Sequence, residues 1–216
     1  MKLLLGCVNS PVSLVGYDWE KGEIFWSLSQ EQLKVCGVCY DKYDLLISSD
    51  NFITRLTPSE VFRIELTHSV RVINDSLFGV ADTGHSVIRI FNKTGEQVEI
   101  FDPIGYWQDI PADAIHLNDF VLTPYGMLAS CFDYRPWCLV RKETSWENWC
   151  SGGYGLIINL TGIGNKGMGR IVGCGFNHPH SLHYVDPCLY VCSSATGQFH
   201  RCKFIKGGLL VEDMHY

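Results

Sequence analysis

The sequence predicts an all-β fold built from a repeated unit of short strands, and three observations indicate it. The segment from His68 to Gly84 resembles the segment from His180 to Gly197, which has one more residue in its second turn. No window of about a dozen residues keeps the 3.6-residue apolar period of an α-helix. The 21 glycines in 216 residues indicate many turns.

Both copies of the repeat have the pattern strand, tight turn, strand, tight turn, strand. Nine positions separate the opening histidine from the first apolar residue of the second strand, from His68 to Leu77 and from His180 to Leu189. Apolar and other residues then alternate in a third segment, as expected for a strand with one buried face. These third segments are residues 87–91 and 199–204.

Three further units follow from the same template. Residues 13–26 match the second and third strands around a turn at 20–22, and residues 36–56 match the same two strands. Residues 116–132 place two strands around a turn at 123–126. Residues 29–32 and 58–61 could each begin a single helical turn, and we expect no longer helix.

Five units predict a small β-propeller with five blades, folded as a single domain over residues 1–216. Each unit has about 43 residues, which is the size of one four-stranded blade. Stacking such sheets radially buries their faces and protects their edges. A sandwich or barrel of the same strands is the alternative, but it would not explain a histidine repeated at one point of the unit.

The repeated histidines predict a metal site. In a propeller the first strand of each blade lines the central channel, so its first residues lie at one mouth of that channel. His68, His116 and His180 each open such a strand, and counting nine residues back from Leu45 reaches Cys36. We expect these side chains to converge on a divalent ion, with zinc the first choice and iron, copper or nickel also suited to imidazole. Packing histidines copied with the repeat are the alternative.

The other histidines and the cysteines receive simpler interpretations. His183 is three residues beyond His180 and is expected to face the opposite side of the strand, while His85, His200 and His215 are expected to face solvent. Ten cysteines without an export signal are expected to be reduced thiols, which favours a cytoplasmic protein.

Charge and hydropathy argue against two classes of partner. With 17 basic and 23 acidic residues the net charge is −6, so the chain lacks the excess of basic residues that favours nucleic-acid binding. No apolar run approaches the roughly 18 residues of a membrane-spanning helix, so we expect no membrane partner. Oligomeric state is left open.

Two phrases resemble those of a known family. His-Leu-Asn-Asp at 116–119 and Pro-His-Ser-Leu at 179–182 flank a glycine-rich segment at 152–158. They are similar to the His-Leu-Asn-Gly and Pro-His-Ser motifs of an uncharacterised bacterial β-propeller family, over about residues 66–204. The chain departs from that family at Asp119, where glycine is favoured, and is shorter than its members. The resemblance implies a propeller fold and no established activity.

These features predict a metal-binding propeller that acts on a small molecule at a histidine-lined channel mouth, as a lyase, isomerase or hydrolase. No residue is assigned as the catalytic acid or base. The rival hypothesis is a non-catalytic binding module or scaffold. It would use the aromatic-rich insertions at 104–109 and 133–149 as its contact surface.

Overall fold

The fold consists of β-strands joined by turns and loops. The structure, a computed structural model, describes residues 2–6, 12–18, 20–29, 37–40, 45–49, 52–56, 59–63, 67–103, 113–133, 155–160 and 169–215. Within these ranges the regular structure is entirely β, so the all-β prediction is confirmed. None of the described residues belongs to a helix that could cross a membrane.

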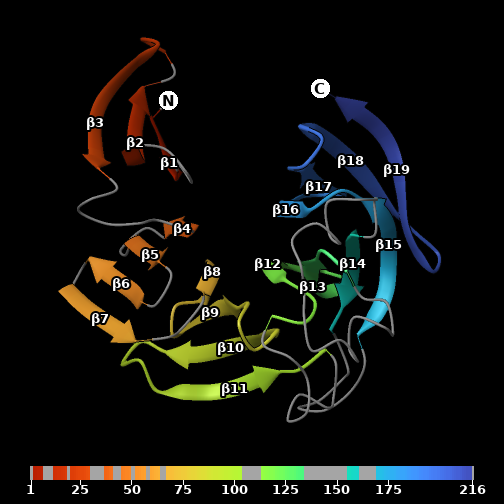
Figure 1. The fold of residues 1–216 in the computed structure, drawn as a ribbon, viewed down its shortest axis with the longest axis horizontal. Coiled ribbons are helices and arrows are strands. Elements are labelled where there is room, and N and C mark those ends of the chain that lie inside the picture. The colour runs from red at the N-terminus through yellow and green to blue at the C-terminus, as the bar shows by residue number, and fades with distance from the viewer. Residues whose placement is uncertain are drawn as a thin grey trace. The chain divides into compact units, whose positions relative to one another are not determined.

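The strands form five sheets, in each of which the strands are hydrogen-bonded in chain order (Figure 1). The first sheet has three strands, β1 (Lys2–Gly6), β2 (Val12–Asp18) and β3 (Glu23–Ser29). The second has β4 (Gly37–Tyr40), β5 (Leu45–Ser49), β6 (Phe52–Leu56) and β7 (Ser59–Arg63). The third has β8 (Thr67–Asn74), β9 (Leu77–Asp82), β10 (Val87–Asn92) and β11 (Gln97–Phe101). The fourth has β12 (Leu117–Thr123), β13 (Gly126–Cys131), β14 (Gly155–Asn159) and β15 (Arg170–Phe176). The fifth has β16 (Pro179–Val185), β17 (Cys188–Ser193), β18 (Gln198–Ile205) and β19 (Gly208–His215).

The sheets reproduce the repeat read from the sequence, with two differences. Only four of the sheets in the described residues have four strands, so five complete four-stranded blades are not seen. The single helical turn considered at 58–61 is wrong, because Ser59–Arg63 forms strand β7 and pairs with β6 from Leu56↔Ser59 onward. Hydrogen bonding to a neighbouring strand outweighs a weak local helix signal.

The chain divides into two compact units, residues 1–80 with 91–96 and residues 81–90 with 97–216. In the first unit, Val70, Phe78, Val80 and Phe91 form a buried cluster. The Phe78 and Phe91 rings stack with their centroids 5.4 Å apart. Cys39 of β4 packs against this cluster, and its sulfur accepts a hydrogen bond from the Val72 amide at 3.2 Å. The expectation of one domain stays a prediction.

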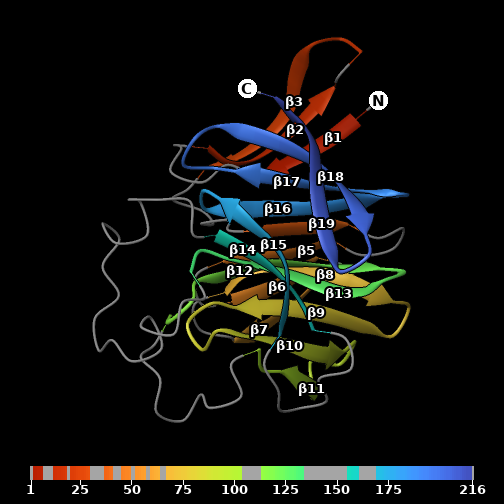
Figure 2. The ribbon, with the colours of Figure 1, turned by 90° about the vertical axis from the view of Figure 1, so that its right-hand side faces the viewer.

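In the second unit the sheet β12–β15 packs against the sheet β16–β19. Their core contains Leu128, Ile157, Phe176, Leu182, Leu189, Val191 and Cys202. Strand β16 lies beside β12, as Figures 1 and 2 both show. Burial of these apolar side chains between two sheets is the main stabilising contribution to this unit.

Burial in the second unit is high in β12 and β13 and low in β19. The first four residues of β12 are buried, as are the last five of β13, whereas six of the eight residues of β19 are exposed. Polar side chains near the start of β12 are therefore withdrawn from water and need partners within the protein. The candidate functional site lies at this buried end.

Candidate functional site

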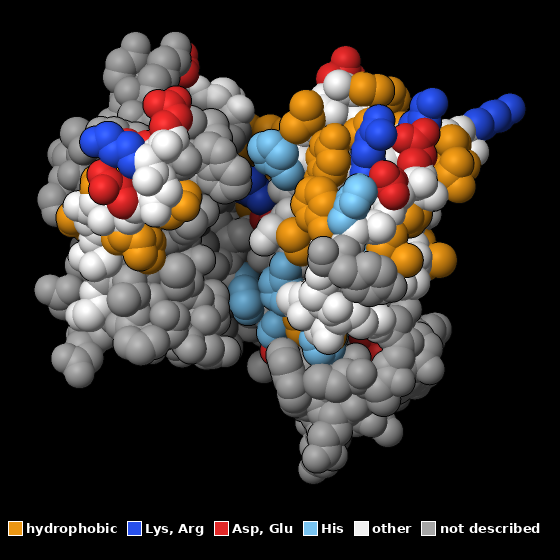
Figure 3. Space-filling model, turned by 90° about the horizontal axis from the view of Figure 1, so that it is seen from above, with side chains coloured by type: hydrophobic (Ala, Val, Ile, Leu, Met, Phe, Trp, Pro, Cys, Tyr) orange, Lys and Arg blue, Asp and Glu red, His pale blue; other side chains and the backbone are white. Residues whose placement is uncertain are grey.

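Strand pairing brings four chain segments of the second unit together. Leu117 at the start of β12 pairs with Cys131 at the end of β13, and Pro179 at the start of β16 pairs with Ser193 at the end of β17. Because β12 also contacts β16, the segments just outside these four strand ends become neighbours. Histidine side chains gather on the face of the molecule seen in Figure 3.

The Phe132 ring lies at the centre of a histidine cluster, which we define as His116, His178 and His180. Phe132 follows β13 directly and is 1% exposed. Its ring centroid is 4.2 Å from that of His116 and 4.1 Å from that of His178, whose ring is nearly parallel to it. The His180 ring meets it edge-on at 5.0 Å. One buried aromatic ring therefore sets the positions of three imidazoles.

Asp113 orients His116. The Asp113 carboxylate oxygens lie 2.9 and 3.0 Å from His116 Nδ1, which donates to them. A carboxylate on one ring nitrogen fixes the tautomer and makes the other nitrogen more basic. Nε2 of His116 therefore carries the lone pair that a metal ion or a proton would use.

His180 is oriented by neutral groups instead. Its Nδ1 lies 2.9 Å from the backbone oxygen of His178 and 2.9 Å from Ser194 Oγ, which itself donates to the same backbone oxygen at 3.1 Å. The pKa of His180 is lowered to about 4: burial is the main cause, the hydrogen bond to the His178 backbone opposes it, and the nearby His116 imidazole adds a smaller lowering. His180 is therefore neutral at pH 7, with Nδ1 protonated and the lone pair on Nε2.

A buried carboxylate joins β12, which follows His116, to β16, which contains His180. Asp119 is 3% exposed and accepts hydrogen bonds from the amides of Phe120 at 2.8 Å and Leu182 at 2.7 Å. Next to it, Asn118 is 1% exposed and its Oδ1 accepts from Ser130 Oγ at 2.7 Å. Among the described residues, no acceptor lies within hydrogen-bond distance of Asn118 Nδ2.

The backbone at the cluster is strained. Asp113, His116, His178 and Ser181 have φ angles of 58°, 47°, 49° and 52°, and the only other described non-glycine residue with a positive φ is Ser86. This left-handed region is uncommon for residues with a side chain, and such strain concentrates at functional sites. The strain supports a functional role for the cluster.

The structure brings together two of the four predicted metal ligands. His116 and His180 both contact Phe132. His68 is the second residue of β8 and belongs to the first unit, and Cys36 lies outside the described residues. In the part of the chain that the structure describes, no group of three or more His, Cys, Asp and Glu side chains could hold a metal ion.

Sequence reasoning missed part of this site. Phe132, Asp113 and His178 were not among the expected site residues. An aspartate three residues before a histidine is a usable signal, because Asp82 binds His85 Nδ1 at 2.9 Å in the same spacing. The expectation that His200 faces solvent is wrong, since it is 6% exposed and bonded to Ser193 Oγ at 2.9 Å.

His183 is exposed on β16, and because the pairing register shifts between His180 and His183, the side of the strand that it faces stays a prediction. The described cysteines are free thiols, and Cys131, Cys188 and Cys202 are buried like small apolar residues.

Comparison with known proteins shows the fold. No family model and no curated protein matches the chain. A solved structure of a protein of unknown function from Bacteroides caccae is 15% identical with a TM-score of 0.68, over 99% of this chain and 72% of that one. The β-propeller domain of Myceliophteria thermophila Cps50 (Swd1) is 12% identical with a TM-score of 0.57, over 99% and 68%. The chain has the fold of a β-propeller.

A third similar structure is a streptogramin B lyase, 12% identical with a TM-score of 0.58. The match covers 99% of this chain and 64% of the lyase. At these identities the likeness concerns the fold, and the chain spans about two thirds of the length of these relatives. Function must therefore be argued from the side chains of the site.

Proposed function

We propose that this β-propeller binds a divalent metal ion at the histidine cluster and acts there on a small molecule. The observation that carries the proposal is that His116 and His180, beside the same Phe132 ring, are each bonded at Nδ1 and present Nε2 as the basic nitrogen. Imidazole ligands of metal ions usually have their other nitrogen bonded in this way.

The donor atoms fit an ion with nitrogen ligands, zinc first and iron, copper or nickel next. His116 and His180 would supply two ligands, and His68 and Cys36 stay ligand predictions from the sequence. When bound, such an ion supplies Lewis acidity or lowers the pKa of a bound water, which serves a lyase, an isomerase or a hydrolase.

The chain's own residues would prepare this site. Asp113 holds His116 in one tautomer, and the low pKa of His180 keeps its Nε2 unprotonated in mildly acidic solution. The buried Phe132 ring contacts the imidazoles of His116, His178 and His180 and would limit the access of water to them. The streptogramin B lyase similarity illustrates that a protein of this fold can be a lyase. Membership of the bacterial propeller family and a cytoplasmic location remain predictions beside this proposal.

Metal analysis of the purified full chain tests the proposal. After reconstitution with zinc and dialysis, about one ion should remain per chain in the wild type. His116→Ala and His180→Ala should each lose it, because a zinc site needs all of its ligands. His183→Ala is the matched control on β16 and should keep the ion, because that side chain is exposed.

Two further variants refine the ligand set. Asp113→Asn should weaken zinc binding roughly 10- to 100-fold, as expected for the loss of a carboxylate behind a ligating histidine. His68→Ala and Cys36→Ser should weaken it if these residues complete the site, and unchanged affinity in either would remove that residue from the proposed ligands. A wild-type chain that retains no ion would overturn the metal site and favour a non-catalytic binding module.

A further inference from the structure

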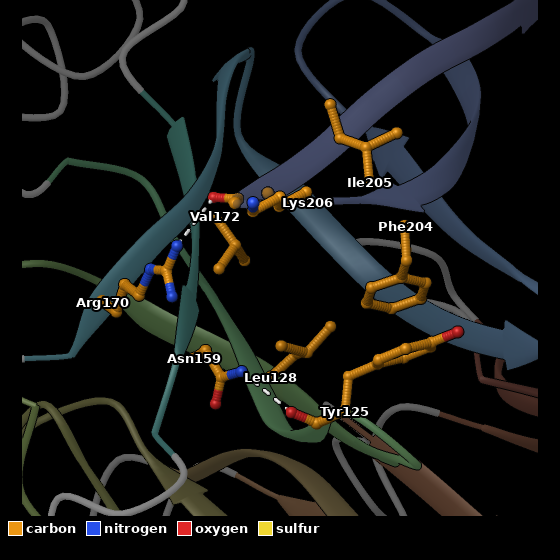
Figure 4. A pocket seen from close by; sticks show the side chains of 10 residues that line it. Tyr125, Leu128, Asn159, Arg170, Val172, Phe204, Ile205 and Lys206 are labelled. Carbon is orange, nitrogen blue, oxygen red and sulfur yellow. Dashed lines mark hydrogen bonds between the residues drawn. The ribbon is translucent and has the colours of Figure 1, made fainter.

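A cavity of about 410 Å³ lies in the second unit, away from the histidine cluster. Its walls come from the β12–β13 turn, β13, the end of β14, the start of β15, and the end of β18 with the turn that follows (Figure 4). β12 runs for seven residues from the cluster to this cavity. At about 3.3 Å per residue its two ends are roughly 20 Å apart. The two sites are therefore separate.

The inner wall of the cavity is apolar and aromatic. Leu128 is fully buried, and Val172 and Phe204 pack against the core of the unit. The Tyr125 ring stacks on the Phe204 ring with centroids 4.2 Å apart and planes 21° apart, and Tyr125 is 51% exposed. One side of this aromatic pair thus remains accessible to a flat ligand.

The rim of the cavity is positively charged. Arg170 and Lys206 line it, and none of the ten lining residues is acidic. In the described part of the chain neither cation forms an ion pair. Arg170 Nη2 donates to the Gly207 backbone oxygen at 3.2 Å, which anchors the guanidinium beside the cavity. A held guanidinium is suited to binding a carboxylate.

We propose that this cavity binds a small aromatic carboxylate. The ring would lie against Tyr125, Leu128 and Val172, and the carboxylate would pair with Arg170 and Lys206. The volume lies within the range of small-molecule sites, and the combination of an apolar wall and a few polar groups is typical of them. Figure 4 shows Arg170 and Tyr125 on opposite sides of the space, as an amphipathic ligand requires.

Binding of benzoate to the full chain tests this inference, with the Gly207 and Gly208 amide signals in NMR spectra as reporters. We expect saturable shifts with a Kd on the order of 1 mM, reasonable for so small a ligand. Acetate, which lacks the ring, and benzamide, which lacks the charge, should each bind at least tenfold more weakly. Equal binding of either one, or no saturation by benzoate, would overturn the proposal.

Variants locate the site. Arg170→Gln should weaken benzoate binding at least tenfold and Lys206→Gln about threefold, since charge-assisted hydrogen bonds are the stronger ones. Lys203→Gln removes the same charge from β18 at a lysine that faces Glu212, and should leave binding unchanged. Tyr125→Ala, in an exposed turn, should reduce the preference for benzoate over acetate. Full benzoate affinity in Arg170→Gln would contradict the inference.

The benzoate-binding experiment does not depend on the proposed metal site. Arg170→Gln should retain zinc, and His116→Ala should retain benzoate binding, because the two sites lie at opposite ends of β12. Failure of one proposal can therefore be distinguished from failure of the other.

Discussion

His116 lies directly before β12 and His180 is the second residue of β16, and different partners hold the two rings. A carboxylate orients His116, whereas a backbone oxygen and a serine hydroxyl orient His180. At His180, burial is the main cause that lowers the pKa of the imidazole to about 4. The repeat therefore places two chemically different imidazoles beside one another, which is a useful combination in a site that binds a metal or moves protons.

His200 makes the stability of the chain depend on pH. Burial lowers its pKa below the ordinary value of 6.5, so the unfolded chain takes up a proton at a higher pH than the folded chain does. As the pH falls below about 6.5, the free energy of unfolding should therefore decrease until the folded-state pKa is reached. In His200→Gln this part of the pH dependence should disappear.

Urea unfolding at pH 7 and pH 5 measures the effect of His200. His215→Gln is the control, because that side chain is 61% exposed. The explanation would be wrong if wild type and His200→Gln lost equal stability between the two pH values.

At the scale of elements, Asp119 links two sheets through a single side chain. Its carboxylate accepts from an amide of β12 and an amide of β16. Asp119→Ala should lower the free energy of unfolding by about 3 kcal/mol, because two buried amides lose a charged acceptor. Asp213→Ala, at an exposed carboxylate of β19, should cost less than about 0.5 kcal/mol.

Hydrogen exchange of the Leu182 amide gives a local measure of the same link. In Asp119→Ala the exchange rate of the Leu182 amide should increase, and this increase should be larger than that of the amides in β18. Unchanged protection of Leu182 would mean that the hydrogen bond does not hold β16 in place.

Gly155 allows β14 to approach the segment that carries His180. A Cβ atom at Gly155 would lie 2.3 Å from Pro179 Cδ and 2.6 Å from the Phe176 backbone oxygen. Gly155→Ala should therefore destabilise the protein by about 3 kcal/mol and reduce zinc binding, since Pro179 must move.

Gly169→Ala is the comparison for Gly155→Ala. A Cβ atom at Gly169 would meet only side-chain atoms, at 3.2 Å or more. The substitution should therefore lower the free energy of unfolding by less than about 1 kcal/mol. Equal stability of the two variants in thermal unfolding would contradict the close approach at Gly155.

At the scale of the whole molecule, one sheet belongs to both compact units. The boundary between the units falls after Val80 within β9 and after Ile90 within β10. Unfolding of either unit would break strands that belong to the other, so calorimetry should show one transition for residues 1–216. Two separate transitions would mean that the units fold independently.

Deletion of residues 208–216 extends this test. It removes β19, which pairs along β18 and packs Leu209 against the core. We expect the deleted chain to lose the cooperative transition.

Local sequence patterns were sufficient to predict most of the strands. Alternation of apolar residues and the turns at 20–22 and 123–126 predicted β2, β3, β12 and β13, because strand period and turn chemistry depend on neighbours in sequence. The repeat also placed His180 near the start of β16, whereas His116 lies directly before β12 rather than in it. Strand β7 was missed because its pairing with β6, rather than its own residues, determines its structure.

The features that the sequence did not predict depend on contacts between sheets. Phe132 between the histidines, the Asp119 link, the burial of His200 and the cavity beside Arg170 all join residues that are distant in the chain. Residue order alone defines which segments extend and where they turn, since those preferences are local. Which polar side chains become buried, and what they then bind, depends on how two sheets pack, and that follows from the folded chain as a whole.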